Sequence, residues 1–434
     1  MKQPDAIVIG GGLAGCEAAW QLACRGKKVA LWEMKPAHFS PAHSSTYLAE
    51  LVCSNSLKAS KEDSASGILK REMRRLGSLL LLCADKTAVP AGGALAVDRL
   101  AFAKMVTDKI EAHPNIERVE KQADCLPDHP YVIVATGPLT DGALAEEINA
   151  LCGEPLSFYD AAAPIVSFES IDMSRAFFQG RYDQPADYLN CPMTKEEYDA
   201  FYQALMQAER AELHSFDVRH FEGCMPIEAI AARGYQTPLF GPMSPKGLTD
   251  PHTGRWPYAA VQLRREDKAG TMYNLVGFQT NLKFAEQKRV FGMIPALRNA
   301  EYLRYGVMHR NTYLPKQTLN DVLQLKARPN IRFAGQITGV EGYMESAAMG
   351  LWAGLCCALQ MENRQVTAPD TQTAMGALIH YISEYDGKDY QPMNMNFGLM
   401  APLETGRMPK AQKQKLRSEQ AKQAFEHWMS YIEG

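Results

Sequence analysis

The first 33 residues alternate between short apolar runs and glycine, and this pattern predicts one structural unit. Residues 6–9 form an unbroken apolar run rich in β-branched side chains, which is typical of a short buried strand. Three glycines then follow in the spacing G-x-G-x-x-G: Gly10, Gly12 and Gly15. A helix is expected next, with Gly26 at its C-terminal cap. Residues 28–32 are expected to form a second strand, which ends at Glu33.

This strand–turn–helix–strand unit is suited to bind a dinucleotide. The first glycine permits a tight turn, the second lets a pyrophosphate approach the backbone, and the third lets the helix pack closely on the strand. The helix N-terminus offers N–H groups to the phosphates. Glu33 lies eighteen residues after Gly15, where an acid bonds a ribose hydroxyl. We therefore expect Gly11, Leu13 and Ala14 to contact the dinucleotide as well. The alternative is a glycine-rich turn in another kind of βα unit.

Two later stretches resemble the rest of such a binding site. Residues 131–137 form an apolar run that ends in Ala-Thr-Gly, and in flavoproteins with two dinucleotide folds a strand of this kind returns beside the first. Its small terminal residues, Thr136 and Gly137, would leave room for a cofactor. Residues 38–46 are rich in Ser, Pro and His without periodicity, so we expect a loop that lies over the cofactor.

A second helix N-terminus is expected near the cofactor. Residues 331–336 return as a strand, and a glycine-rich stretch leads to a helix from about residue 345. Gly350 and Gly354 on that helix would permit close packing. The helix N-terminus would meet the pyrophosphate or the flavin ring. Four residues around it are therefore predicted to bind the cofactor: Gly335, Gln336, Gly342 and Tyr343.

Two basic stretches have more than one interpretation. The apolar periodicity of residues 67–83 predicts a single helix. Its cations form either a solvated face or a contact to phosphates: Lys70, Arg71, Arg74 and Arg75. The final helix carries an apolar stripe that includes Phe425 and Trp428, and its beginning is basic. These basic residues are again either solvated or the place to look for RNA contacts.

The pattern changes from about residue 157. Pro, aromatic and polar residues alternate there, and a capping box at residues 194–197 begins a helix. The sequence predicts an α/β protein of the FAD-binding, Rossmann-like, two-dinucleotide-fold class with a large inserted α+β domain. Residues 1–156 and 321–434 would form the FAD-binding domain, including a helical tail, and residues 157–320 the inserted substrate or RNA domain.

Composition excludes several classes of protein. The 434 residues are 46% apolar and contain no run of 18 apolar residues, so we expect no membrane span. The chain start lacks a secretory cleavage pattern, so the cytoplasm is the expected compartment. The net charge of −3 excludes a globally basic nucleic-acid binder, and no DNA partner is expected. Ten cysteines without a C-x-x-C pair argue against a metal site and a disulfide framework.

Two cysteines and one cluster of polar residues are candidates for chemistry. Cys53 is flanked by small polar residues, so it is either accessible or an ordinary packed thiol. Cys224 lies between Gly223 and Pro226 in a turn that could present its thiol to a ligand. A third candidate site combines His309, Arg310 and Asn311, although a lone histidine is more often structural.

Longer stretches resemble a known family. GGGLAGCEAAWQLA, AELVCSNSLKA, FEGCMPIE, GFQTNLKFAEQKRVF, RYGVMHRNT and FAGQITGVEGYMESAAMGLWAG are similar to the TrmFO family, the bacterial folate- and FAD-dependent tRNA (uracil-5-)-methyltransferases. These stretches are spread along most of the chain. Met349 and Trp352 stand where smaller or aliphatic residues are expected, and this departure does not touch the chemistry.

The resemblance implies a reaction and its cofactors. A methylene group from 5,10-methylenetetrahydrofolate would become the methyl group of 5-methyluridine in the T-loop of tRNA. The reduced flavin of FAD would carry the one-carbon unit on its N5 atom, and NADH or NADPH would restore the reduced flavin. The implied partners are tRNA and folate, without a membrane partner.

The resemblance also implies roles for residues. Carbon 5 of uracil becomes nucleophilic only after a thiolate adds to carbon 6. Cys224 matches the family cysteine that makes this addition. Cys53 matches the second functional cysteine, which would protect or activate the flavin methylene or remove the carbon 5 proton. His309 would stack on the folate or position the base.

Four alternatives remain at this point. The same chemistry could act on ribosomal RNA, or the chain could be a wobble-uridine-modifying flavoprotein, although such chains are usually longer. A flavin-dependent NAD(P)H oxidase or disulfide reductase would need a C-x4-C dithiol or a second G-x-G-x-x-G unit, and the sequence has neither. A non-catalytic, FAD-dependent RNA-binding protein would keep its function after Cys224→Ala.

Overall fold

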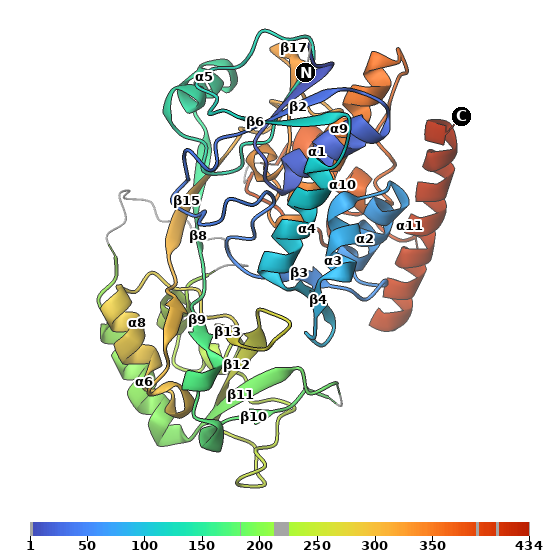
Figure 1. Cartoon of the computed structure of the whole chain (residues 1–434). Helices are drawn as coiled ribbons and strands as arrows, with labels where there is room; N and C mark the ends of the chain where they lie inside the picture. Colours follow the sequence, from blue (N-terminus) through green and yellow to red (C-terminus); the bar gives the residue numbers. More distant parts are fainter. Residues whose placement is uncertain (1–2, 183, 212–224, 388–389, 405–407, 434) are drawn as a thin grey trace.

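A parallel sheet forms the frame of the upper part of the molecule (Figure 1). The computed structural model describes residues 3–182, 184–211, 225–387, 390–404 and 408–433. The sheet has the order β16-β17-β7-β1-β2-β6, and all neighbours are parallel except β16 and β17. Its strands are β1 (Ala6–Ile9), β2 (Val29–Glu33), β6 (Ile116–Glu120), β7 (Val132–Val134), β16 (Gln324–Leu325) and β17 (Arg328–Phe333). The pairing of β7 with β1 confirms the expected return of this strand.

Two helices cross this sheet in contact with each other. They are α1 (Leu13–Cys24) and α9 (Tyr343–Met361). A Cβ atom on Gly350 would lie 2.1 Å from the carbonyl oxygen of Ala14, and one on Gly354 would lie 2.5 Å from that of Ala18. Because only glycine fits at both positions, the two helices approach backbone to backbone. The prediction of close packing at these glycines is confirmed.

The stretch predicted as one helix over residues 67–83 is two helices, so that prediction is wrong. They are α2 (Ala65–Arg75) and α3 (Leu79–Lys86). Gly77 separates them with a φ of +75°, a conformation that favours glycine. Ser78 then caps α3, and the buried carboxylate of Glu17 accepts hydrogen bonds from its first N–H groups. The apolar periodicity runs through the break because both helices bury one face on the same core.

The four cations of this stretch have partners within the protein. Lys70 is buried and donates to the carbonyl oxygen of Ala59 at 2.8 Å. The other three form hydrogen bonds or ion pairs with Ser418, Asp85, Glu426 and Glu433. Arg71 and Arg75 thereby hold the final helix, α11 (Lys410–Glu433), against α2. The interpretation of this cluster as a solvated face therefore holds for Arg74 and Arg75, which are exposed, and not for the buried Lys70.

The remaining elements of the upper part surround this frame. A small antiparallel sheet has the order β3-β5-β4. Its strands are β3 (Ser56–Ala59), β4 (Ala88–Val89) and β5 (Ala94–Val97). The other helices are α4 (Arg99–Glu111), α5 (Gly142–Cys152) and α10 (Ala374–Glu384). No helix in the described ranges is both long enough and apolar enough to cross a membrane.

An antiparallel sheet forms the frame of the lower part and has the order β10-β11-β12-β13-β9-β14. Its strands are β9 (Ile165–Ser167), β10 (Phe177–Phe178), β11 (Tyr188–Met193), β12 (Ala259–Arg265), β13 (Met272–Leu275) and β14 (Tyr302–Arg304). Its helices are α6 (Lys195–Gln207), α7 (Ile227–Ala232) and α8 (Phe284–Phe291). The capping box predicted before α6 is confirmed, because the Thr194 and Glu197 side chains each accept the other residue's backbone N–H.

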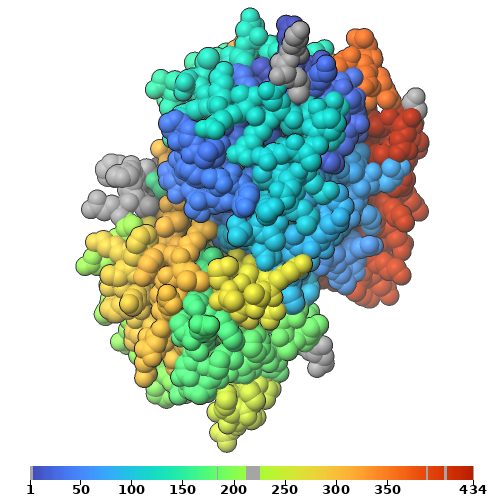
Figure 2. Space-filling model, viewed as in Figure 1, coloured from blue at the N-terminus to red at the C-terminus, as the bar shows by residue number. Residues whose placement is uncertain are grey.

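Two antiparallel strands, β8 (Leu156–Ala161) and β15 (Met308–Tyr313), run between the two parts (Figure 1). In the space-filling view the green and yellow lower part lies directly below the blue and cyan upper part (Figure 2). The ion pair of Arg99 with Glu266, 2.9 Å, and the hydrogen bond from Asn55 Nδ2 to the Arg265 carbonyl, 2.9 Å, join them. The segment that carries Cys53 therefore lies at the junction.

Candidate functional site

The glycine turn after β1 has the geometry that the sequence predicted. Gly10 has a φ of +100°, so it occupies the region that only glycine adopts readily. A Cβ atom on Gly15 would lie 1.8 Å from the carbonyl oxygen of Gly10. The turn and the first helical residues are therefore packed against each other. A Cβ atom on Gly12 would meet nothing within 4 Å, so the space in front of the α1 N-terminus is open.

Glu33 closes this turn from the end of β2. Its carboxylate accepts hydrogen bonds from the backbone N–H of Gly11 at 2.8 Å and of Lys35 at 3.0 Å. The carboxylate is buried, and it lines the same cavity as the glycine turn. A carboxylate has about four lone-pair sites, so two remain for a ligand hydroxyl.

A second helix begins beside the first. Gly342 precedes α9, and no side chain caps this N-terminus; the same holds for Gly12 and α1. Both N-termini line one cavity of about 430 Å³. Unpaired N–H groups and the positive ends of two helix dipoles therefore point at the same space, which favours a negatively charged group there.

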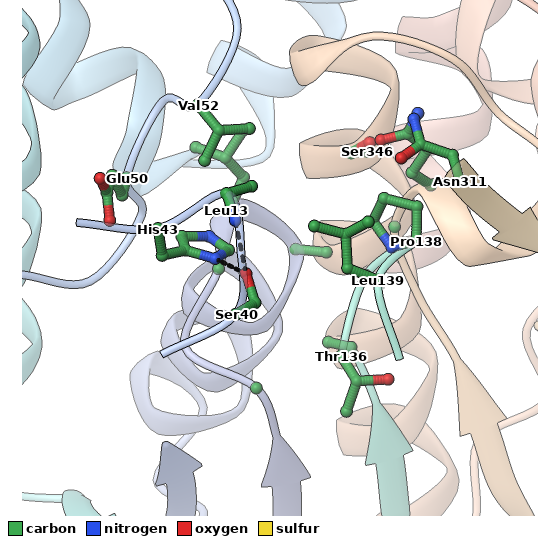
Figure 3. Close-up of a pocket in the computed structure, with 18 of the residues that line it drawn as sticks. Leu13, Ser40, His43, Glu50, Val52, Thr136, Pro138, Leu139, Asn311 and Ser346 are labelled. Carbon is green, nitrogen blue, oxygen red and sulfur yellow. Dashed lines mark hydrogen bonds between the residues drawn. The ribbon is translucent and has the colours of Figure 1, made fainter. Parts of the chain in front are cut away.

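Most of the site residues predicted from the sequence line this cavity. Side chains from four segments face it in Figure 3: His43 after β2, Leu139 after β7, Asn311 on β15 and Ser346 on α9. Its lining includes the predicted residues Gly10, Gly11, Gly12, Leu13, Ala14, Glu33, Cys53, Thr136, Gly137, His309, Asn311, Gly335, Gln336, Gly342 and Tyr343. Gly15 lies below the turn and supports it without lining the cavity.

These residues fit a bound FAD. The open space in front of Gly12 would accept a pyrophosphate, and the uncapped N–H groups of the two helices would bind it. Glu33 would hold a ribose hydroxyl. The carboxyl ends of β1 and β7 meet at this point of the sheet, where ligands bind in open α/β folds.

Cys53 lies in the wall of the same cavity and is firmly held. The Tyr343 hydroxyl accepts hydrogen bonds from the backbone N–H groups of Cys53, at 2.6 Å, and Ser54, at 3.1 Å. Arg99 donates to the carbonyl oxygen of Leu51, and Arg304 to that of Val52. The backbone on both sides of the thiol is thus fixed by side chains from distant parts of the chain.

The environment of Cys53 favours the neutral thiol. Burial raises the pKa of Cys53 well above its ordinary value, and the negative charge of Asp160 raises it further. Arg99 and Arg304 act in the opposite direction but do not compensate. The thiol lies 3.6 Å from the carbonyl oxygen of Ala161, to which it donates a hydrogen bond.

Alkylation of Cys53 by iodoacetamide is therefore expected to be slow at neutral pH. Only the thiolate reacts, so the rate should rise about tenfold per pH unit and show no plateau at about pH 8.5, the ordinary thiol value. Mass spectrometry of the peptide that contains Cys53 would measure the rate, with the exposed Cys125 as reference in the same sample. A plateau near neutral pH would mean that the site stabilises the thiolate.

Cys224 lies outside the described residues. The residues on either side of this segment are placed. The N–H of Ala211 donates to the Asn281 carbonyl at 2.8 Å, and the N–H of Ile227 donates to the Gln279 carbonyl at 2.7 Å. Gln279 lines the cavity, so the end of the segment at Ile227 is anchored beside it.

The three polar residues of β15 do not point the same way. His309 and Asn311 line the cavity, whereas Arg310 between them is exposed on the opposite face of the strand. The His309 Nε2 atom is buried and has no hydrogen-bond partner among the described residues. Burial, followed by the charges of Arg304 and His43, lowers the pKa of His309, so its imidazole is neutral at neutral pH.

Several cavity residues were not predicted individually. The loop over residues 38–46 lies over the cavity as expected, and Ser40 and His43 from it form a 2.6 Å hydrogen bond there (Figure 3). Asp160 is the cross-strand neighbour of His309. Burial and the charge of Asp160 raise the pKa of Glu341, which accepts a hydrogen bond from Gln336 at 2.5 Å. No local sequence signal marks Asp160, because its neighbours on β8 follow no motif.

Comparisons with known proteins agree with this geometry. The family model described as glucose inhibited division protein A matches residues 5–365. The methylenetetrahydrofolate–tRNA-(uracil-5-)-methyltransferase TrmFO of Listeria monocytogenes serotype 4b (strain F2365) is 54% identical over 422 residues, 96% of this chain and 97% of that protein. The protein of the same name from Acetivibrio thermocellus is 56% identical over 397 residues, 91% of each chain.

A solved structure has the same fold. The form II crystal structure of Aquifex aeolicus GidA gives a TM-score of 0.72 at 14% identity and covers 99% of this chain and 74% of that one. At this identity the likeness concerns the fold alone. It confirms the predicted α/β class with a Rossmann-like parallel sheet.

Proposed function

The chain belongs to the TrmFO family, and from this premise we propose that it is a methylenetetrahydrofolate–tRNA-(uracil-5-)-methyltransferase that uses FAD. It methylates carbon 5 of a uridine in tRNA with 5,10-methylenetetrahydrofolate as donor and NADH or NADPH as reductant. The T-loop uridine is the target that we propose. These reactants occur together in the cytoplasm, where we expect the enzyme to act.

One structural observation supports this proposal independently of the family likeness. Cys53 lines the same cavity as the glycine turn and the two uncapped helix N-termini. A dinucleotide held by those N-termini would place its reactive end in a cavity that also contains a thiol. When bound, the FAD would supply electrons from NAD(P)H and pass on the one-carbon unit from folate.

The protein residues have distinct tasks in the proposed reaction. The Cys224 thiolate adds to carbon 6 of the uracil, and the electron pair of the 5,6 double bond moves toward carbon 5 and the carbonyl at carbon 4. Carbon 5 then bonds to the one-carbon unit and loses its proton to a base. The bond between the one-carbon unit and its carrier would then break, and a hydride that NAD(P)H supplies by way of FAD would reduce the methylene carbon to a methyl group. Loss of the thiolate from carbon 6 restores the 5,6 double bond.

Cys53 begins this sequence as a neutral thiol, because its pKa is raised. It can shield the reactive end of the cofactor in that form. To accept the carbon 5 proton it must first lose its own proton, and Asp160, in the same cavity wall, is the carboxylate that we propose as acceptor. His309 remains neutral and able to accept a hydrogen bond from folate or from the base.

The division of labour between the two parts of the chain follows from this scheme. We propose that residues 1–156 and 321–434 hold FAD and that residues 157–320 present the RNA. Two separate buried apolar clusters support this division, one around the parallel sheet and one around the antiparallel sheet. Cys224 belongs to the second part, and Ile227, three residues after it, is held by Gln279 in the wall of the cavity.

An in vitro assay tests the function directly. The purified holoprotein, unmodified tRNA transcript, 5,10-methylenetetrahydrofolate and NADPH are expected to yield 5-methyluridine at a single T-loop position, mapped by mass spectrometry of RNA fragments. A reaction with S-adenosylmethionine as sole donor should give no product. If 5-methyluridine forms on ribosomal RNA fragments and not on tRNA, the result would support ribosomal RNA as the substrate.

A further inference from the structure

Three aromatic rings form a continuous stack on the antiparallel-sheet part. We call Phe284, Tyr305 and Tyr302 the aromatic ladder. The centroids of Phe284 and Tyr305 are 4.8 Å apart with an interplanar angle of 14°. Those of Tyr305 and Tyr302 are 5.2 Å apart at 4°. The three rings are thus close to parallel, whereas aromatic neighbours in protein cores often adopt edge-to-face arrangements.

The ladder is fixed at one end and open at the other. Tyr302 begins β14 and pairs with Val166 in the antiparallel sheet, and most of its ring is buried. Phe284 is the first residue of α8, and its side chain is 54% exposed. Tyr305 stacks on the Phe284 ring. An apolar ring is therefore held in a fixed orientation at the surface, with little conformational freedom left to lose on binding.

Both segments that build the ladder continue into the catalytic cavity. Gln279, five residues before Phe284, lines that cavity, and so does His309, four residues after Tyr305. Arg304, next to Tyr305, donates to the carbonyl oxygen of Val52 beside Cys53. Both segments of the ladder are therefore within five residues of the cavity lining.

The residues that precede the segment 212–224 lie next to Phe284. The N–H of Lys283 donates to the carbonyl oxygen of Glu209 at 3.1 Å, and Arg210 forms a β-bridge with Leu282. The chain therefore enters the segment whose sequence contains Cys224 next to Phe284.

We propose that the aromatic ladder is a stacking platform for a nucleobase next to the target uridine, with the Phe284 ring as the contact surface. This inference rests on the proposed function and extends it to the RNA-binding surface. An enzyme that acts on a base must take that base out of its stack, and the neighbouring bases then lose a stacking partner. Aromatic side chains replace such partners in proteins that bind single-stranded RNA.

Two of the cations near Phe284 are already paired within the protein. Lys283 forms an ion pair with Glu209 at 2.7 Å, and Arg289 forms one with Glu286 at 2.6 Å. Lys288, one turn after Phe284, adds a positive charge to this surface. The contribution of the Phe284 ring itself should depend little on salt, because stacking involves no ion pair, whereas phosphate contacts weaken steeply with salt.

The test compares Phe284→Ala and Phe284→Leu with Phe284→Trp in the FAD-loaded protein. Binding of an RNA stem-loop with the T-arm sequence is expected to weaken by about 5- to 100-fold in the first two variants, the range measured for loss of one base–aromatic stack. Phe284→Trp should retain wild-type affinity. Phe240→Ala, at a ring that is 81% exposed in the same part of the chain, is the matched control and should not change binding.

A spectroscopic readout distinguishes stacking from a general loss of shape. Two RNAs would carry the fluorescent base 2-aminopurine, one directly before and one directly after the target uridine. The 2-aminopurine fluorescence of one of these RNAs should be quenched by the wild type and by Phe284→Trp, and not by Phe284→Leu. The FAD content and melting temperature should be the same in all variants, because Phe284 is exposed. The loss of affinity should be equal at low and at high salt.

The outcomes separate this inference from the proposed function. If the wild type forms 5-methyluridine and Phe284→Ala binds RNA with unchanged affinity, the platform is refuted and the methyltransferase function stands. If the wild type binds the stem-loop through Phe284 but gives no methylated product, the platform stands and the proposed function fails. A wild type that binds no RNA overturns both.

Discussion

Replacing Cys53 with alanine is expected to reduce the formation of 5-methyluridine by about 10²- to 10⁴-fold, the range for loss of a group that transfers protons in the reaction. The thiol lines the cavity that we assign to FAD, and no other described cysteine does so. The product would be measured by mass spectrometry of the RNA under saturating folate and NADPH. The FAD absorbance per protein should remain unchanged, since the glycine turn and both helix N-termini are intact.

Two comparisons make this result specific. Cys125→Ala removes an exposed thiol that does not line the cavity and should be fully active. Cys224→Ala should be as inactive as Cys53→Ala, but it should also fail to form a covalent adduct with 5-fluorouracil-containing RNA, because it lacks the thiolate for carbon 6. Wild-type activity in Cys53→Ala would remove this thiol from the mechanism.

Replacing Gly12 with alanine is expected to abolish or strongly weaken FAD binding while the apoprotein stays folded. The added Cβ atom would meet no protein atom within 4 Å, and Gly12 has an ordinary φ of −75°, so the folded chain accommodates it. The methyl group would instead occupy the space in which a pyrophosphate approaches the backbone. Titration of the apoprotein with FAD, followed by flavin fluorescence, should show at least about tenfold weaker binding, a loss of about 1.4 kcal/mol.

Two further glycine variants act as references. Gly15→Ala places its Cβ atom 1.8 Å from the Gly10 carbonyl oxygen, so it should lower the melting temperature as well as FAD binding. Gly93→Ala, an exposed position with open space around it, should change neither. If Gly12→Ala binds FAD as tightly as the wild type, the pyrophosphate does not lie over this turn.

The raised pKa of Cys53 gives this cysteine a different role from that proposed for Cys224. A neutral thiol does not compete with Cys224 for an electrophile, so two cysteines can share one reaction without equivalent roles. Burial first, and then the charge of Asp160 on β8, raise the pKa of Cys53. Asp160 is the cross-strand neighbour of His309 on β15.

Much of the cofactor site could be predicted from the sequence because its constraints are local. The spacing of Gly10, Gly12 and Gly15 is fixed by close contacts within one turn, and Glu33 follows at the end of the next strand. The small residues Gly350 and Gly354 likewise signalled a close helix contact. Cys53 could be proposed only through a family resemblance, since its flanking residues are compatible with an inert thiol.

The sequence by itself determined the glycine turn, the strands that flank it and the apolar faces of the helices, because these depend on contacts between residues close in the chain. Only the tertiary structure decided that Gly77 divides a continuous apolar pattern into two helices, and that Arg71 and Arg75 hold α11. It also decided that Tyr343 holds the backbone of Cys53 from 290 residues away. Such contacts depend on which surfaces meet when the chain folds, and no short pattern records that choice.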